Sequence, residues 1–285
     1  MQSTTLTLPT DLVNEIWTGV QEEAILPRLS GAEAQKFGKS EIMVLKGTPK
    51  AEIVGEGDAK SGQVLTYETK EVIPVKLHTG VRVSQELIWG DEQRQRIIMT
   101  DIAKHIRKSL VDALDTIGFK GVNPKTGSKA SQIKESIFDT VLEVECEEGS
   151  EDHAIDEAYL AIIDNDYAPN GIAASRKFDT QFKMVYDLNG YKKYPAGVDG
   201  FDGLKAAVGV LDDEKEVLAV VGDFSAFKWG VQEEIPLEVI PYGNPDNQEP
   251  YRDLAGHNEV FVRAEVVYGI GIMDLNAFAK VKKAD

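Results

Sequence analysis

Alternating apolar and polar positions dominate the first third of the chain. From Val72 to Val83, apolar side chains recur at alternate positions with polar ones between them, which predicts one long strand with one buried face. Residues 41–54 predict two short strands around a turn. Between these segments lies the glycine-rich sequence GEGDAKSGQ, residues 55–63, so we expect it near the tip of an extended β-hairpin.

Apolar residues three or four positions apart mark two helices. Residues 91–115 carry the longer stripe, which predicts a helix about 35 Å long and the longest element of the chain. Residues 11–24 predict a shorter amphipathic helix that Thr10 or Asp11 caps and Pro27 ends. The long stripe consists of Ile98, Ile102, Ile106, Leu110 and Leu114.

The pattern changes after Ser150, where helical and strand-like segments alternate. Ser150 is expected to cap one helix, and a second helix is expected after the short strand GIAAS. The segment VLAVVG is apolar throughout, as in a strand buried on both faces. This alternation predicts an α/β subdomain over residues 150–240. Strands are expected at 171–175, 204–210 and 217–222, followed by LEVIPYG and EVFVRAEVVYGIGIM.

Composition is that of an ordinary globular protein and adds two constraints. The 285 residues, 42% of them hydrophobic and 28% charged, are enough for a sizeable core. There are 48 acidic residues against 31 basic ones, a net charge of −17, which argues against a protein that wraps nucleic acid with a basic surface. No apolar stretch approaches the ~20 residues needed to span a membrane, so no membrane partner is expected.

Candidate catalytic and binding motifs fail on their spacing. Gly57 and Gly62 have the separation of a phosphate-binding loop, but Gln63 and a strand follow where that motif needs a lysine and a helix. The four histidines are scattered. The one cysteine, Cys146, excludes an internal disulfide and a multi-cysteine metal site and favours a reducing, intracellular origin. We therefore expect no catalytic residues, no cofactor and no metal.

Four stretches, in a fixed order along the chain, carry a resemblance to a known family. They are PKAEIVGEGDAKSGQVLTYETKEVIPVKLHTGVRVSQELI, ASRKFDTQFKMVYDLNGYKKYP, VVGDFSAFKWGVQEEIPLEVIPYG and NEVFVRAEVVYGIGIMDLNAFAKVK. Through them the chain resembles the major capsid proteins of tailed phages, which have the Hong Kong 97 fold. The resemblance covers nearly all 285 residues.

The resemblance implies an α+β fold of the Hong Kong 97 type. Its parts would be an N-terminal arm, an extended β-hairpin loop, a peripheral subdomain with a long spine helix, and an axial α/β subdomain. Carried onto this sequence, the arm is residues 1–38, the extended loop 49–80, the peripheral subdomain 39–48, 81–140 and 241–285, and the axial subdomain 141–240.

The resemblance also implies a shell subunit rather than an enzyme. Such subunits self-assemble into hexamers and pentamers, and these form an icosahedral shell around double-stranded DNA without sequence-specific binding. The shell is assembled in the host cytoplasm and becomes the capsid of the virion, with portal and decoration proteins as further partners. Because the chain starts directly on the arm, we expect a separate scaffolding protein or none.

Two other functions stay open at this point. An encapsulin-like nanocompartment has the same fold but encloses cargo enzymes, and a hydrophobic cargo-docking patch near the arm would indicate it. The polar start of the arm and the long hairpin favour the virion. A soluble α/β enzyme is the third interpretation, and the sequence disfavours it because it has no glycine loop, metal set or nucleophile motif.

One covalent reaction is also implied by the resemblance. Some family members link subunits by an isopeptide bond between a lysine on the extended loop and an asparagine in the closing region, helped by a glutamate, and these groups come from different subunits. Lys60, Asn258 and Glu265 occupy the matching positions of this chain. Two ordinary interpretations stand beside this one: Lys60 is solvated at a loop tip, and Glu265 forms a structural ion pair with Arg263.

Overall fold

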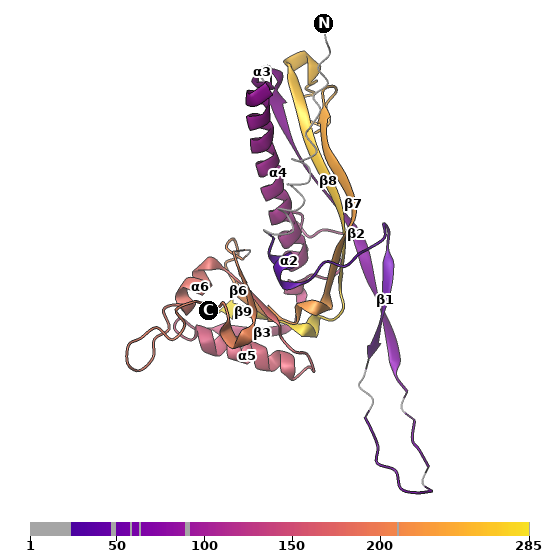
Figure 1. Cartoon of the computed structure of the whole chain (residues 1–285), viewed down its shortest axis with the longest axis vertical. Coiled ribbons are helices and arrows are strands. Elements are labelled where there is room, and N and C mark those ends of the chain that lie inside the picture. Colours follow the sequence, from indigo (N-terminus) through magenta and orange to yellow (C-terminus); the bar gives the residue numbers. More distant parts are fainter. Residues whose placement is uncertain are drawn as a thin grey trace.

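The structure is a computed structural model of the whole chain, and the residues it describes are 24–46, 50–57, 59–62, 64–88, 92–209 and 211–284. The arm helix predicted at 11–24 lies outside these residues, apart from Ala24. The described chain forms two β-sheets, a long helix, and a hairpin that projects beyond both sheets (Figure 1).

The long helix predicted from its apolar stripe is confirmed as α4 (Glu92–Lys120). It ends at Lys120 rather than near residue 115, because Ile117 and Phe119 are also buried and continue the apolar face. A single turn, α3 (Gln85–Ile88), leads into it. The stripe is buried at Ile102, Ile106, Leu110 and Leu114 and half-buried at Ile98.

The long predicted strand is confirmed as β2 (Thr66–Ser84), which is 19 residues long. It has two antiparallel partners in succession. Residues 66–72 pair with β1 (Ser40–Lys46), and residues 73–84 pair with β8 (Glu259–Ile272). One continuous strand therefore belongs both to the projecting hairpin and to the sheet behind it.

β7 (Phe227–Ile240) completes this sheet on the other side of β8, so the strand order is β1-β2-β8-β7. α4 lies along one face of the sheet, which we call the inner face (Figure 1). Val262, Val266 and Ile270 of β8 are buried in the apolar core on this side. The opposite, outer face carries the polar positions predicted for β2.

The expectation of two short strands at 41–54 is only half right. β1 is the first of them, but residues 50–54 form no strand, because the β1–β2 ladder ends at Lys46 and the described residues of the opposite arm, 59–62, are not in strand conformation either. Ile53 is fully exposed there. The described residues of 55–63 lie at the end of the hairpin, as predicted (Figure 1).

The second sheet has five strands in the order β3-β9-β6-β4-β5. Its central strand β6 (Val217–Gly222) is buried apart from the half-buried Leu218, as predicted for VLAVVG. Helices α5 (Glu151–Ile163) and α6 (Arg176–Phe182) share an apolar core with one face of this sheet. The other strands are β3 (Leu142–Cys146), β4 (Gly171–Ala174), β5 (Lys205–Val208) and β9 (Phe278–Lys283).

Sheet membership crosses the expected subdomain limits at two places. β7 begins at Phe227, inside the segment expected to be axial, but it pairs with β8 in the four-stranded sheet. β9 lies inside the segment expected to be peripheral, but it pairs with β3 and β6 in the five-stranded sheet. Pairing joins residues far apart in sequence, and the local pattern does not contain that information.

Several short turns connect these elements. Ser150 stands at the N-cap of α5 as predicted, but its hydroxyl makes no capping hydrogen bond. The N–H of Gly149 donates to the carboxylate of Glu151 at 3.1 Å instead. Single 3₁₀ turns occur at Ile137–Asp139, Phe201–Gly203, Phe224–Ala226, Ala255–His257 and Leu275–Ala277.

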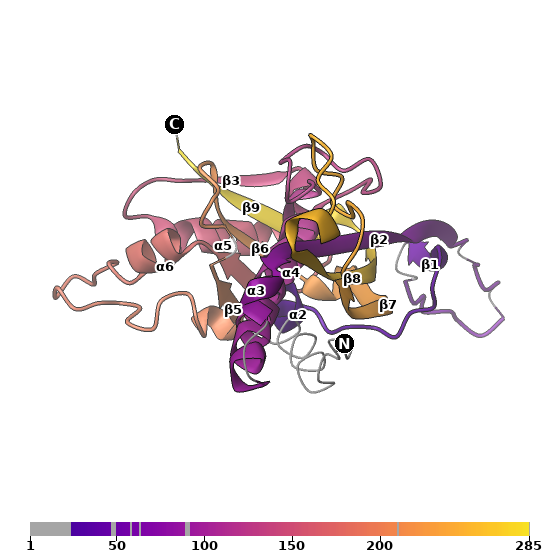
Figure 2. The same cartoon turned by 90° about the horizontal axis from the view of Figure 1, so that it is seen from above.

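The described N-terminal segment runs from the foot of α4 to the hairpin. It begins with the short helix α2 (Ile25–Leu29), whose apolar residues are buried. Residues 31–38, which we call the strap, then cross the outer face of the sheet and join β1 (Figure 2). The N–H of Glu33 donates to the carbonyl oxygen of Trp229 at 2.9 Å, and the N–H of Gly38 donates to the Gln232 side chain at 3.0 Å.

Candidate assembly surfaces

The hairpin presents large apolar side chains that nothing in the described chain covers. Met43 of β1 and Tyr67 of β2 are 74% and 71% exposed, and Ile53 and Val64 of the connecting loop are 102% and 93% exposed. We call these four residues the hairpin apolar set. A group of exposed apolar side chains on a projecting element is typical of a surface that another molecule covers.

Local sequence explains why this loop extends rather than folding back. Gly57 has φ +90°, in the left-handed region that favours glycine. The hydroxyl of Ser61 donates to the carboxylate of Glu52 and joins the two arms of the loop. Lys60 lies between these features and is exposed, as the solvated-lysine interpretation predicts.

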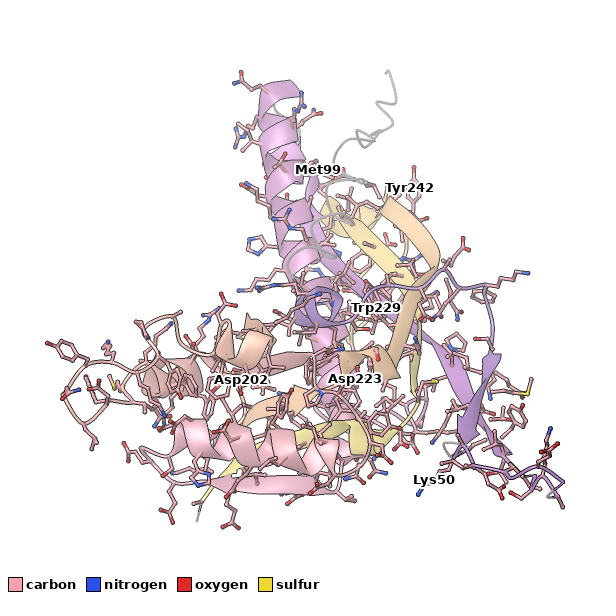
Figure 3. The ribbon with its side chains drawn as sticks, turned by 60° about the horizontal axis from the view of Figure 1, so that its bottom comes forward. Lys50, Met99, Asp202, Asp223, Trp229 and Tyr242 are labelled. Atoms are coloured by element: carbon pink, nitrogen blue, oxygen red, sulfur yellow. The ribbon has the colours of Figure 1, made fainter. Side chains whose placement is uncertain are left out.

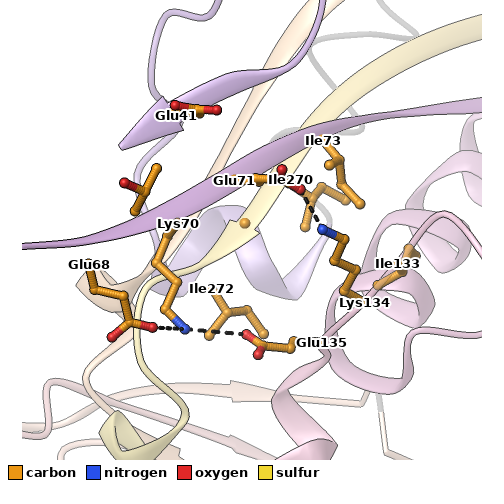
Figure 4. A pocket seen from close by; sticks show the side chains of 12 residues that line it. Glu41, Glu68, Lys70, Glu71, Ile73, Ile133, Lys134, Glu135, Ile270 and Ile272 are labelled. Carbon is orange, nitrogen blue, oxygen red and sulfur yellow. Dashed lines mark hydrogen bonds and ion pairs between the residues drawn. The ribbon is translucent and has the colours of Figure 1, made fainter. Parts of the chain in front are cut away.

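A charged pocket of ≈ 440 Å³ marks the root of the hairpin, where β2 passes from β1 to β8 (Figure 4). Lys134, from the segment after α4, donates to the carboxylate of Glu71 on β2 at 2.6 Å. Lys70 lies 3.3 Å from Glu68 and 3.8 Å from Glu135. The hydrogen bond from Lys134 lowers the pKa of Glu71. Ion pairs that are this accessible to solvent contribute little to stability. Their effect is therefore on the direction of the hairpin and not on the free energy of unfolding.

Arg82 ties the other end of β2 to the loop at residues 241–258. Its guanidinium contacts the carboxylates of Asp246 at 2.5 Å and Glu259 at 3.0 Å. It also donates to the carbonyl oxygen of Arg252 at 3.1 Å. The hydrogen bonds from Arg82 hold the pKa values of Asp246 and Glu259 below their usual range. One guanidinium therefore joins β2 both to this loop, through Asp246 and Arg252, and to the start of β8, through Glu259.

Two further tips of the molecule expose large side chains. On the 241–258 loop, Tyr242 and Tyr251 are 73% and 69% exposed. Figure 3 shows Tyr242 at one end of the molecule and Lys50, on the hairpin, at another. The loop at residues 183–195 forms a third tip. Its exposed large apolar and aromatic side chains are Met184, Tyr186, Leu188 and Tyr191.

Glu265, the predicted helper of the cross-link, is buried on the outer face of the sheet. Its carboxylate lies 2.5 Å from the Lys76 ammonium and 3.1 Å from the Arg263 guanidinium. The hydrogen bond from Lys76, reinforced by the charge of Arg263, lowers the pKa of Glu265. The ion pair named as the ordinary interpretation is therefore present, and within one chain this carboxylate is a weaker base than a solvated glutamate.

The structure does not bring the three predicted cross-link residues together within one chain. Lys60 lies at the end of the hairpin. Asn258 is exposed and has φ +52° at the end of a 3₁₀ turn. Glu265 lies further along β8, about 23 Å from Asn258 at ~3.3 Å per residue of strand. A reaction among these groups would therefore need more than one subunit, as the resemblance implies.

The described chain offers little for metal, thiol or membrane chemistry. Over its described residues, no group of three or more His, Cys, Asp or Glu side chains could hold a metal ion. None of the described helices combines the length and apolar character needed to cross a membrane. Burial raises the pKa of the Cys146 thiol to about 11, so it stays protonated and unreactive.

Sequence reasoning missed a buried carboxylate on α4. Asp115 is 3% exposed and accepts hydrogen bonds from the backbone N–H groups of Ile25 and Leu26 at 2.9–3.0 Å. The available signal was an acidic residue directly beside Leu114, a member of the apolar stripe. A charge in that position needs donors, and α2 supplies them.

Sequence reasoning also missed the groove that the strap occupies. Gly230 of β7 and Gly269 of β8 lie opposite each other in the ladder. A Cβ atom on Gly230 would lie 2.0 Å from the carbonyl oxygen of Glu33. Glycine inside a strand marks a close approach of another backbone, so this signal was in the sequence.

Known proteins resemble this chain over nearly its whole length. The model of the phage capsid family matches residues 4–283. A solved structure from Mycobacterium phage Ogopogo is 38% identical, has a TM-score of 0.79, and the match covers 92% of each chain. One from Gordonia phage Cozz is 23% identical with a TM-score of 0.78, over 92% of this chain and 87% of that chain.

A more distant structure, described as the capsid of an empty GTA particle, is 14% identical and has the same fold, with a TM-score of 0.57. The match covers all of this chain and 94% of that one. No curated protein matches the chain. The family match and the 38% identity over 92% of both chains agree with the fold and with the exposed hairpin. The chain therefore belongs to the phage capsid family, whose major capsid proteins form the shell of the phage particle.

Proposed function

We propose that this capsid protein assembles with copies of itself into hexamers and pentamers of an icosahedral shell that encloses double-stranded DNA. The observation that supports this most directly is the hairpin apolar set, which is exposed in the single chain. A projecting hairpin has no core of its own, so a neighbouring copy is the natural cover. Such a contact joins different surfaces of two subunits, and heterologous contacts close into rings.

The energetics favour many small contacts over one strong contact. Each apolar side chain of the set that a neighbour buries contributes about 1.5–3 kcal/mol before the costs of association. A ring repeats this contact in every subunit, and each contact raises the effective concentration for the next. The net charge of −17 supports a wall that does not adhere to the DNA it encloses.

The test replaces two members of the hairpin apolar set. In the double variant Ile53→Ser, Val64→Ser, we expect a folded subunit that no longer forms shells, because the side chains are already exposed in the single chain. Shell formation is measured by sedimentation and negative-stain microscopy. Folding is measured by circular dichroism and thermal unfolding of the unassembled subunit.

The matched control is Val141→Ser, which removes an equally apolar side chain that is 77% exposed but lies outside the hairpin. We expect this variant to assemble like the unchanged protein. Shells formed by the double variant with normal yield would contradict a role for the hairpin in assembly. Loss of folding in the double variant would instead show that the hairpin stabilises the subunit itself.

The proposal extends to the other partners of a phage shell. It includes a separate scaffolding protein, portal and decoration proteins, assembly in the host cytoplasm, and no catalytic activity. The encapsulin-like alternative is not favoured, because the matching family is that of phage capsids and the similar structures come from phages.

The isopeptide cross-link remains a prediction. The neutral amine of Lys60 would attack the amide carbon of Asn258 on another subunit, Glu265 would accept the amine proton and pass it to the amide nitrogen, and the new C–N bond would form as the old one breaks and ammonia leaves. Lys76 and Arg263 both contact the Glu265 carboxylate in the single chain. For Glu265 to accept the proton, the Lys60 amine must reach this carboxylate beside these two partners.

Denaturing electrophoresis of assembled shells tests the cross-link. Cross-linked shells would give covalent multimers that Lys60→Arg, which keeps the positive charge, abolishes. A single band near 31.3 kDa from unchanged shells would contradict the reaction.

A further inference from the structure

The short helix α2 lies at the junction between the two sheets. It contacts α4, which packs on the four-stranded sheet, and also β4 and β5 of the five-stranded sheet. Figures 1 and 2 both show it between the foot of α4 and the five-stranded sheet. Its buried residues share one apolar core with Ala173 of β4 and Ala207 of β5. The guanidinium of Arg28 also donates to the carbonyl oxygen of Ala206 at 3.5 Å.

Each side of this junction has a glycine that makes room for an α2 side chain. A Cβ atom on Gly118 of α4 would lie 2.1 Å from Cδ1 of Leu26. A Cβ atom on Gly171 of β4 would lie 3.0 Å from Cδ2 of Leu29. We call α4 with the four-stranded sheet one body, and the five-stranded sheet the other. Leu26 fits closely against the first body and Leu29 against the second, and α2 fills the space between them.

Asp115 fixes the beginning of α2 to α4. Its carboxylate oxygens accept the N–H of Ile25 at 3.0 and 2.9 Å, and Oδ1 also accepts the N–H of Leu26 at 2.9 Å. A carboxylate buried to this degree is costly unless it is hydrogen-bonded. Departure of α2 would remove these three donor contacts, so the docked position of α2 and the burial of Asp115 depend on each other.

The end of α2 is fixed to β7. The hydroxyl of Ser30 donates to the carbonyl oxygen of Phe227 at 2.8 Å, and the indole N–H of Trp229 donates to the carbonyl oxygen of Ser30 at 2.9 Å. The strap follows directly and leads to β1 of the hairpin. α2 is therefore joined through the strap to the hairpin.

We propose that α2 is a wedge that sets the angle between the two sheets, and that its docking couples the N-terminal segment to the shape of the subunit. With α2 docked, Leu26 packs against Gly118 of α4 and Leu29 packs against Gly171 of β4. With α2 withdrawn, the glycine-lined surfaces of α4 and β4 lose their shared partner and the bodies rotate more freely. This inference goes beyond shell formation, because it concerns one subunit, and its test needs no assembly.

The test uses the unassembled full-length chain. Gly118→Ala places a methyl group where Leu26 now lies, and because alanine favours helix over glycine, it does not weaken α4 itself. Asp115→Asn keeps the size of the side chain but removes its charge and one acceptor oxygen. The matched control is Asp112→Asn, an equivalent change on the same helix at an exposed position.

Two measurements report docking and angle separately. Hydrogen exchange of residues 24–30 reports the docking of α2. Pulsed electron resonance between spin labels at Lys104→Cys on α4 and Glu157→Cys on α5, both exposed in the unchanged protein, reports the angle between the bodies. Cys146 is buried, so labelling is directed to the introduced cysteines.

In Gly118→Ala and Asp115→Asn we expect exchange at residues 24–30 at least tenfold faster and a broader distance distribution, while Asp112→Asn changes neither. Faster exchange with an unchanged distance distribution would overturn the proposal, because α2 would then be docked without setting the angle. Unchanged exchange in both variants would also overturn the proposal, because the docking of α2 would then not depend on Gly118 or Asp115. Circular dichroism confirms that each variant keeps its helices and sheets.

Discussion

The two halves of β2 lie in opposite environments. Residues 73–84 pair with β8 in the sheet that α4 covers, and Val75 and Val83 are buried there. Residues 66–72 pair with β1 in the hairpin, where Tyr67 is 71% exposed. One continuous strand therefore serves two purposes: residues 73–84 stabilise the subunit, and residues 66–72 extend a surface away from it.

The difference separates the stability of the subunit from its capacity to assemble. In the body, apolar side chains are already covered by the same chain, so their removal costs folding energy. At the exposed positions of the hairpin, which are Met43, Ile53, Val64 and Tyr67, they are uncovered, so their removal costs the single subunit little. Four measurements test how sharp this division is.

The largest expected effect comes from a cavity in the body. Leu114 is completely buried, and Leu114→Ala should lower the free energy of unfolding by about 4 kcal/mol. Ile53→Ala, at a fully exposed site of the hairpin, should change it by less than about 0.5 kcal/mol. Chemical denaturation of the unassembled subunit measures both. Similar losses in the two variants would remove the distinction between body and hairpin.

The next effect is a pH dependence that belongs to the body alone. Burial raises the pKa of Asp115 to about 6 from an ordinary value of 3.8, although the N–H groups of Ile25 and Leu26 oppose this. A folded-state pKa above the unfolded value contributes stability that is fully present below about pH 3.8 and is lost as the pH rises through about 6. The contribution is about 3 kcal/mol, from ~1.4 kcal/mol per pKa unit.

Unfolding free energies of the unchanged protein and of Asp115→Asn, measured between pH 4 and pH 7, isolate this contribution. As the pH rises, the free energy of unfolding of the unchanged protein should fall by about 3 kcal/mol relative to that of Asp115→Asn. The control is Asp101→Asn, an equivalent change on the same helix at an exposed position. A difference that moves in the opposite direction would mean that the backbone donors outweigh burial.

A third, smaller effect concerns the strap that covers the outer face of the body. Gly230→Ala drives a methyl group to 2.0 Å from the backbone of Glu33, and should lower the free energy of unfolding by about 2 kcal/mol. Gly269→Ala, directly across the ladder, meets only the ends of the Gln35 and Gln232 side chains and should cost less. Equal costs, measured by thermal unfolding, would mean that the strap does not depend on this groove.

The smallest effect is expected at the root between the two halves. Lys134→Gln removes the ion pair between the exposed Lys134 and the half-buried Glu71, and because such solvent-accessible pairs contribute little, the midpoint of unfolding should stay unchanged. Hydrogen exchange in β1 should become faster, because the hairpin loses one of its braces, while exchange in β8 stays the same. A lowered midpoint would mean that the root of the hairpin unfolds cooperatively with the sheet that α4 covers.

The elements with long, regular patterns could be predicted from the sequence. α4 and β2 were found because an apolar repeat sustained over a dozen or more residues identifies the period directly. The missing strand at 50–54 and the sheet of β9 could not be found this way. A strand needs a partner, and the two partners of β9, which are β3 and β6, both lie far from it in the sequence.

The surfaces were predictable only in part. The exposed hairpin followed from its apolar residues and its place between two strands. The contacts of Arg82 did not, because its partners Asp246 and Glu259 lie more than 160 residues away. Asp115 and the glycine pair of the strap were visible as exceptions to the local pattern, an acid in an apolar stripe and glycines within strands.

The continuity of β2 also has a mechanical consequence. In an antiparallel ladder the hydrogen bonds lie perpendicular to the strands, so a force along β2 loads the bonds to β8 together, in shear. A force that pulls β1 sideways away from β2 opens its bonds one after another, like a zipper. Tension along the hairpin would therefore be carried into the whole ladder between β2 and β8, whereas a sideways pull on β1 would open only the ladder between β1 and β2.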